Sequence, residues 1–176
     1  VTVWRRSLSP TFPVYAMVGR LDDAPLDPTT LERGLAVLAR DEDLPSRTWL
    51  FGIPYAAYAA NLNAMADRFA DAPVNTDDHT LLEYLAPITE RERRREGGST
   101  PVLAWLDLLE FSERLLESSP PDRDPHLVRL TDDQRRQVAA GVAYYGHVVH
   151  RERGDSARAG AYMQQYNRLL APPQGE

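Results

Sequence analysis

The chain of 176 residues contains no cysteine, and its 20 basic residues are all arginine, with no lysine. The lack of cysteine excludes disulfides, thiolate metal ligands and cysteine nucleophiles. The lack of lysine excludes a Schiff base and the lysine of a phosphate-binding P-loop. The net charge of −6 argues against a general nucleic-acid binder, because such proteins rely on basic side chains that contact phosphates.

The sequence also lacks a long apolar run. The longest stretch without a charge, residues 48–66, is interrupted by Gly52, Pro54 and Asn61, whereas a membrane span needs about 20 mostly apolar residues. No signal peptide is visible. The chain begins at Val1 without a methionine, which is expected of a piece of a longer protein. Its 43% hydrophobic and 26% charged residues are typical of a globular protein.

The N-terminal part predicts two strands and two helices. Residues 1–5 and 13–19 have strand-like composition, and the short connection between them favours antiparallel pairing. Asp27 and Pro28 are typical of a helix start. A second helix is expected from Pro54, because apolar residues recur there at helical spacing. This stripe consists of Tyr55, Tyr58, Leu62, Met65 and Phe69.

The C-terminal part is predicted to be mostly helical. One helix runs from Val102 and ends before two prolines at 120–121, and Thr131 with Gln134 forms the capping box of the next. A last amphipathic helix follows residues 154–155. Residues 88–101 are expected to be a solvated linker. Their arginines at 91 and 93–95 could touch phosphate or anionic lipid, but interleaved glutamates nearly cancel this charge.

The fold class predicted from these elements is α+β. A two-stranded sheet is marginal in water, and its unpaired edges invite further pairing. We therefore expect the sheet to be completed by an upstream part of the same protein, by a second copy of the chain, or by a partner.

Three pieces of the sequence carry a family resemblance. They are residues 1–5, residues 13–19 and residues 74–87, the last of which contains Asn75-Thr-Asp-Asp78 and Glu83. In order and spacing they resemble the C-terminal end of spermidine synthase-like proteins, in the branch with a membrane-spanning segment fused upstream. The resemblance covers residues 1–87, with Thr80 standing where the family has proline. It implies that the two strands are the final antiparallel pair of a Rossmann-like methyltransferase sheet.

The resemblance implies a transferase of polyamine biosynthesis that moves an aminopropyl group from decarboxylated S-adenosylmethionine to an amine. The family's nucleotide site and amine-binding residues lie on earlier strands, and nothing in this chain matches them. No Gly-rich strand-to-helix turn is present either. We therefore expect no cofactor and no complete catalytic site in this chain. The implied location is the cytoplasm, either free or tethered to a membrane through a segment outside this chain.

The sequence thus predicts three parts. Residues 1–87 form the C-terminal part of the synthase-like domain, residues 88–101 the linker, and residues 102–172 a helical segment. The spacing of Gly154, Tyr162 and their neighbours weakly resembles one tetratricopeptide helix pair, and such repeats need about three units for stability. This segment is expected to pack on a neighbour.

The most distinctive polar cluster of the sequence follows residue 74. Adjacent carboxylates could hold a cationic amine or a hard metal ion, but Asn, Thr and Asp also bond their own backbone in turns, which is the favoured interpretation. A flanking glutamate is expected to be half-buried and paired with an arginine. The cluster consists of Asn75, Thr76, Asp77, Asp78 and Glu83.

Other candidate residues have an ordinary structural interpretation. His147 and His150 could share a helix face, but a third metal ligand is missing. His79 and His126 indicate nothing specific. The aromatic residues are expected to be core or packing anchors rather than a ligand pocket, although the four C-terminal tyrosines could form a docking face between helices. These residues are Tyr55, Tyr58, Phe69, Tyr144, Tyr145, Tyr162, Tyr166, Trp4, Trp49 and Trp105.

Two functional hypotheses follow. In the first, the strands complete the catalytic sheet of a spermidine synthase-like protein and the helices support association. In the second, the chain is a non-catalytic interaction or scaffolding module that uses the helical face of residues 100–171. A third, weaker alternative is a family branch that has lost aminopropyl transfer.

Overall fold

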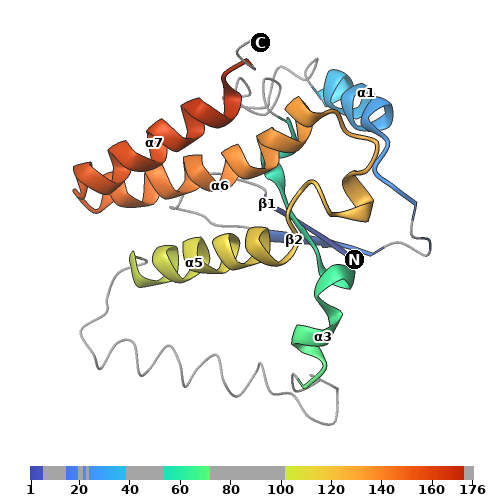
Figure 1. The fold of residues 1–176 in the computed structure, drawn as a ribbon, viewed down its shortest axis with the longest axis horizontal. Coiled ribbons are helices and arrows are strands. Elements are labelled where there is room, and N and C mark those ends of the chain that lie inside the picture. The colour runs from blue at the N-terminus through green and yellow to red at the C-terminus, as the bar shows by residue number, and fades with distance from the viewer. Residues whose placement is uncertain (6–14, 20–21, 23, 39–53, 72–101, 173–176) are drawn as a thin grey trace.

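The computed structural model describes residues 1–5, 15–19, 22, 24–38, 54–71 and 102–172 (Figure 1). Over these residues the protein is α+β and mostly helical, with a small antiparallel sheet packed against helices. The predicted α+β class is confirmed at this level. A relation to a Rossmann-like sheet stays a prediction. The predicted linker and its arginine run lie outside the described residues.

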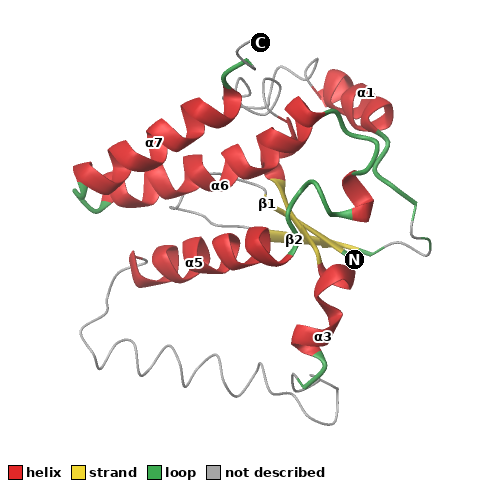
Figure 2. Ribbon diagram, viewed as in Figure 1, coloured by secondary structure: helices red, strands yellow, loops and turns green. Residues whose placement is uncertain are grey.

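The sheet has three strands in the order β2-β1-β3 (Figure 2). β1 (Thr2–Arg5) is the central strand and pairs antiparallel with β2 (Tyr15–Val18), with Trp4 opposite Ala16. The antiparallel pair expected from the sequence is therefore confirmed. Its extent is smaller than expected, since each strand has four residues.

A third strand, β3 (Tyr58–Asn61), pairs antiparallel with the other edge of β1 and corrects the prediction of a two-stranded sheet. The helix predicted from Pro54 to Phe69 is wrong. All four residues of β3 are buried, so no alternation of apolar and polar residues marks the strand, and periodicity alone cannot separate a short buried strand from a helix. The segment is instead η1 (Pro54–Ala57, 3-10), β3, η2 (Leu62–Met65, 3-10) and α3 (Ala66–Phe69).

Helix α1 (Pro28–Leu38) begins where the sequence predicts. One carboxylate oxygen of Asp27 accepts a hydrogen bond from the backbone N–H of Thr29 at 3.0 Å, and the other accepts from the Thr30 hydroxyl at 2.6 Å. The side-chain bond from Thr30 is the main reason that the pKa of Asp27 lies below its usual value. Asp27 thus satisfies a donor of the first turn that has no partner within the helix.

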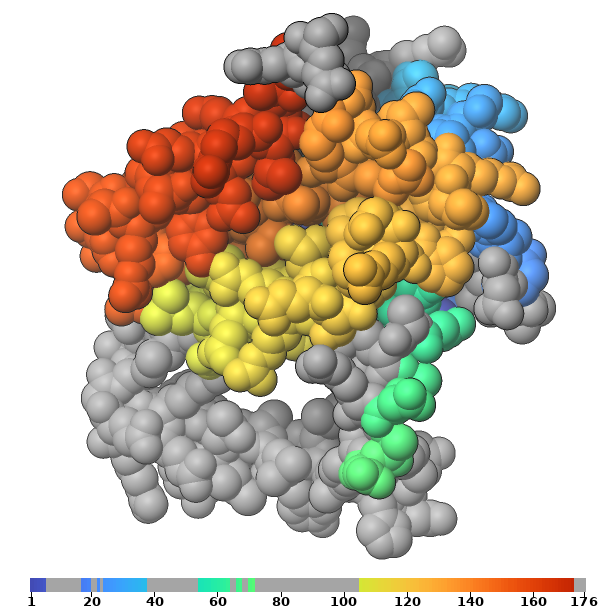
Figure 3. All heavy atoms as spheres, viewed as in Figure 1, coloured from blue at the N-terminus to red at the C-terminus, as the bar shows by residue number. Residues whose placement is uncertain are grey.

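Three long helices make up the C-terminal part: α5 (Val102–Ser118), α6 (Asp132–Glu152) and α7 (Ser156–Leu170). α6 lies between the other two helices (Figure 1) and also packs against η1. The space-filling view shows α5, α6 and α7 as adjoining bands on one side of the molecule (Figure 3). The helices predicted for this part of the chain are confirmed.

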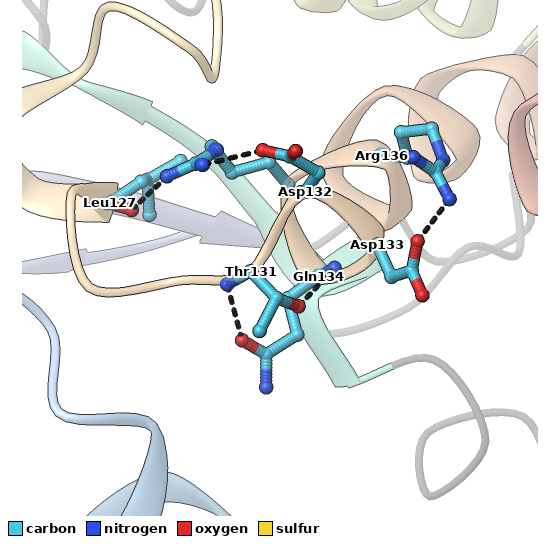
Figure 4. Close-up of polar contacts among 7 residues, drawn as sticks. Leu127, Thr131, Asp132, Asp133, Gln134 and Arg136 are labelled. Carbon is cyan, nitrogen blue, oxygen red and sulfur yellow. Dashed lines mark hydrogen bonds and ion pairs between the residues drawn. The ribbon is translucent and has the colours of Figure 1, made fainter. Parts of the chain in front are cut away.

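The start of α6 contains the predicted capping box (Figure 4). The backbone N–H of Gln134 donates to the Thr131 hydroxyl at 3.2 Å, and the backbone N–H of Thr131 donates to the side-chain oxygen of Gln134 at 2.9 Å. At the other end, Gly154 has φ of 75°, the left-handed conformation that glycine adopts at low cost. These local signals place both ends of α6.

Two glycines let α6 approach its neighbours closely. A Cβ at Gly141 would lie 2.2 Å from the carbonyl oxygen of Ala56 in η1. A Cβ at Gly146 would lie 2.5 Å from the ring of Tyr162 in α7. η1 and α7 can therefore pack this closely against α6 only because Gly141 and Gly146 have no Cβ.

The two faces of the sheet are covered by different elements. Val3 and the alanines of β3 pack against Leu115 of α5. Trp4 lies on the other side, against a cluster that includes Tyr58 and Val138 of α6. Arg5 is buried, and its guanidinium donates to the carbonyl oxygens of Ala56 at 2.9 Å and Tyr58 at 3.0 Å. The sheet is thus joined to η1 as well as to the helices.

Candidate functional site

The polar cluster predicted after residue 74 lies outside the described residues. Its members are Asn75, Thr76, Asp77, Asp78 and Glu83, and their role stays a sequence-based prediction. His79, Trp49 and the arginines at 91 and 93–95 lie outside the described part as well. The candidate sites below are therefore those that the described residues form.

A buried carboxylate, Asp124, is the centre of the main polar cluster. It is 3% exposed. The Tyr58 hydroxyl donates to its Oδ2 at 2.6 Å, and the side-chain amide of Asn61 donates to its Oδ1 at 3.3 Å. The Ser119 hydroxyl is 3.3 Å from Oδ2, and the backbone N–H of His126 donates to Oδ1 at 2.9 Å. Both oxygens are thus held by donors from three parts of the chain.

Local sequence positions these groups. Asp124 caps the 3-10 helix η3 (Pro125–Leu127), with proline at its first turn. Tyr58 and Asn61 are the first and last residues of β3. The His126 ring stacks on Tyr58 with 6.0 Å between centroids. Asp followed by proline is a sequence signal for such a cap, but His126 and Tyr58 gave no signal that they lie together.

The Asp124 cluster is suited to bracing the fold rather than to catalysis. Burial, followed by the hydrogen bond to Asp124, raises the pKa of Tyr58 far above its ordinary value of 10.0. The tyrosine therefore keeps its proton, and the carboxylate keeps its donor. Tyr58, Asp124 and His126 are all buried, so a substrate cannot reach the pair without displacing the packing around it.

We expect the Tyr58→Phe variant to lose about 1.5–3 kcal/mol of unfolding free energy, because the hydrogen bond to a buried charged acceptor disappears. Tyr55→Phe is the matched control. Among the described residues, the contacts of the Tyr55 hydroxyl are long, 3.4 Å to Glu32 and 3.3 Å from Gln134, so its loss is expected to be about 0.5 kcal/mol. Urea denaturation of both variants measures the difference, and equal losses would contradict a bracing role for Asp124.

The second candidate site is a groove beside α1 with a volume of about 840 Å³. This size is within the range of small-molecule sites. Its lining is mostly apolar, with polar groups near the start of α1. The lining residues are Trp4, Ala24, Pro25, Leu26, Asp27, Thr30, Leu31, Gly34, Leu35, Val37 and Arg129.

Among the described lining residues of that groove, Arg129 is the one that is basic. It is exposed, and it forms no hydrogen bond or ion pair with the residues that the structure describes. It contributes to lowering the pKa of Asp27, so the two charges are close enough to interact. Arg129 and Asp27 thus form a pair of opposite charges among the lining residues of the groove.

The two C-terminal histidines lie at the junction of α6 and α7. The Nδ1 of His147 is 2.9 Å from the carbonyl oxygen of Ala159 in α7. His150 is buried, and its ring stacks on Tyr162 with 5.4 Å between centroids. The Tyr162 hydroxyl donates to Glu113 of α5. Over the described ranges, no group of three or more His, Asp or Glu side chains is arranged to hold a metal ion.

The aromatic residues are used mainly for packing. Tyr55, Tyr58 and Tyr145 are buried, as the core interpretation predicts. Tyr144 contacts Tyr166 with 5.4 Å between ring centroids, so these tyrosines join α6 to α7. Burial raises the pKa of Tyr166. The tyrosines thus form contacts between helices of this chain, as the alternative of a docking face between helices allows.

His150 makes the stability depend on pH. Burial lowers its pKa below the ordinary value of 6.5, although Asp155, with Oδ2 3.6 Å from Nδ1, partly opposes this. The folded state therefore favours neutral His150, and its contribution to stability is complete above pH 6.5 and is lost as the pH falls towards the lowered value. We expect the urea concentration at the unfolding midpoint to decrease as the pH is lowered from about 7.5 to about 5.5.

The His150→Phe variant keeps a ring against Tyr162 but cannot titrate. We expect its urea midpoint to fall less over the same pH interval, and the two curves to differ most at the acid end. If the variant and the original chain show parallel pH dependence, His150 is not the group responsible.

Comparisons with known proteins give no relative for this chain: no family model, curated protein or solved structure matches it. Among the described helices, none combines the length and apolar character needed to cross a bilayer. The described residues thus define a small α+β protein with a braced interior, an open apolar groove and an exposed strand.

Proposed function

We propose that this chain is the C-terminal part of a spermidine synthase-like protein, where it completes the sheet of the catalytic domain and supports association, and does not catalyse aminopropyl transfer by itself. The reaction of the whole protein would consume decarboxylated S-adenosylmethionine and an amine. The proposal combines the family resemblance of residues 1–87 with one structural observation.

That observation is the exposed apolar edge of the sheet. Among the strands that the structure describes, β2 is an outer strand in the order β2-β1-β3. Met17 is 74% exposed and Val18 is 44% exposed, although Met and Val are residue types that are often buried. An apolar edge strand with free backbone groups is a template for another strand. The antiparallel β1–β2 pair also agrees with the pair that ends the sheet in the resembling family.

The Asp124 cluster supports the second half of the proposal, that the chain does not catalyse aminopropyl transfer by itself. Asp124 is held by four donors and is closed to solvent, which suits a structural brace. The acidic candidates at Asp77 and Asp78 carry the family resemblance, and their expected role is to shape a turn.

The rival function is a helical interaction module. One observation favours it: within α7 only Ala159 is buried, so most of the helix surface faces outward and is open to a neighbour. The sequence weakly suggests one tetratricopeptide-like helix pair, whereas repeat proteins need about three such units for stability. The rival therefore also requires a partner.

An activity assay separates these functions. Aminopropyl transfer from decarboxylated S-adenosylmethionine to putrescine is measured for the 176-residue chain and for the longest natural polypeptide that contains it. We expect turnover in the long polypeptide and none in the 176-residue chain. Turnover in the short chain would overturn the claim that the reaction needs other parts. Inactivity in both, together with capture of a protein through α7, would favour the interaction module.

The Asp77→Ala, Asp78→Ala double variant of the long polypeptide tests the acidic pair. If the pair shapes a turn, melting temperature and turnover fall together. Loss of turnover with unchanged melting would instead assign the carboxylates to substrate binding.

A further inference from the structure

The connection between α6 and α7 is a short turn with a buried histidine beside it. α6 ends at Glu152 and α7 begins at Ser156, so the two helices form a hairpin (Figure 1). Gly154 turns the chain with φ of 75°. Within the described structure α7 packs mainly on α6, and of its own residues Ala159 alone is buried. α7 is thus attached chiefly through one helix, so it can separate while the rest of the fold stays closed.

His150 lies between α6 and α7, almost out of contact with solvent. Its side chain is 6% exposed. Its ring stacks on the ring of Tyr162 in α7, with 5.4 Å between centroids and 16° between planes. No described residue forms a hydrogen bond with its Nδ1. The neutral ring suits this position because it carries no charge that needs water or an ionic partner.

The surroundings of His150 disfavour a charge on its ring. Desolvation is the main influence, and it holds the pKa of His150 below the ordinary 6.5. Among the described residues, four charged groups also act on the ring. Asp155 in the turn and Glu113 of α5 favour the protonated form, and Arg158 of α7 and Arg153 in the turn oppose it. Because two groups of each sign largely cancel, burial decides that the closed arrangement prefers the neutral ring.

Asp155 serves two groups with one carboxylate. Its Oδ1 accepts the backbone N–H of Arg158 at 3.0 Å and thereby caps α7. Its Oδ2 is 3.6 Å from Nδ1 of His150, which is too far for a hydrogen bond. A protonated ring has an N–H at both nitrogens, and such an N–H bonds a carboxylate at about 2.7–2.9 Å. Protonation therefore draws the carboxylate towards His150 and away from the cap.

We propose that His150 is a pH-sensitive latch for α7: protonation of its ring draws Asp155 from the cap and releases the first turns of α7 from α6. Tyr162 then leaves its stack on His150. Tyr162 packs against the buried cluster that contains Val142 and Val149 of α6, so opening of the latch exposes apolar surface on α6. The latch is independent of the proposed function, because it needs only residues of this chain.

Thiol reactivity measures this opening, because the chain has no cysteine of its own. Ala159→Cys places a thiol at the buried position of α7, and Gly160→Cys places one at the exposed position next to it. The rate of maleimide labelling is measured for each variant at about pH 7.5 and about pH 5.5. Dividing the rate at the exposed site by the rate at the buried site removes the effect of pH on thiol ionisation.

We expect this rate ratio to fall several-fold at the lower pH, with about 10-fold as the limit set by an exposed histidine of ordinary pKa 6.5. His150→Phe keeps a ring against Tyr162 but cannot bind a proton. In the His150→Phe background we expect the same ratio at both pH values. A ratio that does not change in the original background, or that falls equally in both backgrounds, overturns the latch.

Hydrogen exchange of the unsubstituted chain distinguishes opening of α7 from unfolding of the whole protein. After correction for the intrinsic effect of pH, the amides of residues 158–162 should lose protection at about pH 5.5, while the amides of α5 keep theirs. Equal loss in α5 and α7 would indicate global unfolding and overturn the latch. A gain of protection at the Arg158 amide would show that Asp155 pairs with His150 without leaving the cap, which also overturns it.

Discussion

Replacing Gly141 with alanine is expected to destabilise the protein by about 3 kcal/mol or more, near the upper end of overpacking effects. The new Cβ would lie 2.2 Å from the carbonyl oxygen of Ala56 and 2.9 Å from its Cα. These are backbone atoms, so no side-chain rotation relieves the contact. η1 or α6 would have to move, and both lie in the core that holds β3 and Arg5.

Two further glycine variants provide the scale against which the loss of stability in Gly141→Ala is judged. Gly146→Ala places a Cβ 2.5 Å from the Tyr162 ring, which can shift, so we expect a loss of about 1–3 kcal/mol. Gly160→Ala meets nothing within 4 Å and is expected to stabilise α7 by about 0.5–1 kcal/mol. Urea denaturation of the three variants measures the order of their unfolding free energies. A Gly141→Ala variant as stable as Gly160→Ala would contradict the packing of α6 on η1.

Removing the Asp124 carboxylate is the second large effect. Asp124→Ala is expected to cost about 4 kcal/mol, because the buried donors of Tyr58, Asn61 and His126 lose their acceptor together. Near-ultraviolet circular dichroism should report a changed environment for Tyr58, and urea denaturation gives the energy. Asp124→Asn keeps one acceptor oxygen and is expected to cost about half as much.

Asp122→Ala is the matched control for Asp124. Asp122 lies two residues away and is exposed, so the change is expected to alter stability by no more than about 0.5 kcal/mol. If Asp124→Ala is as mild as this control, the carboxylate does not connect β3 to the segment before α6.

Local signals in the sequence predict much of the helical part. Asp27 with Pro28, Thr131 with Gln134, and Gly154 each mark a helix end through contacts within a few residues. Such contacts do not depend on the rest of the fold, so a single sequence reveals them. The composition of β1 and β2 likewise predicts the two strands, and the short connection between them predicts their antiparallel pairing.

Non-local pairing explains what the sequence could not show. β3 is a strand because it pairs with β1, with Ala60 opposite Val3, and its own residues fit a helical pattern equally well. The Asp124 cluster joins residues separated by more than 60 positions, Tyr58 and Asn61 with Asp124. The predicted acidic cluster at residues 75–78 lies outside the described part, so its role still rests on the sequence.

The two open features of the molecule support one account. The braced interior at Asp124 holds β3 and η3 in place, while β2 and the α1 groove present apolar surface outward. Exposed apolar patches of this kind mark interaction sites. We propose that a further strand covers β2 in the complete synthase-like protein.

Backbone hydrogen exchange of β2 tests that account most directly. In the 176-residue chain, the amides of Tyr15–Val18 that do not pair with β1 should exchange rapidly, because β2 is an outer strand. In the longest natural polypeptide, strand pairing should slow them by about 100-fold or more. Equally rapid exchange of these amides in both proteins would contradict the claim that β2 joins a larger sheet.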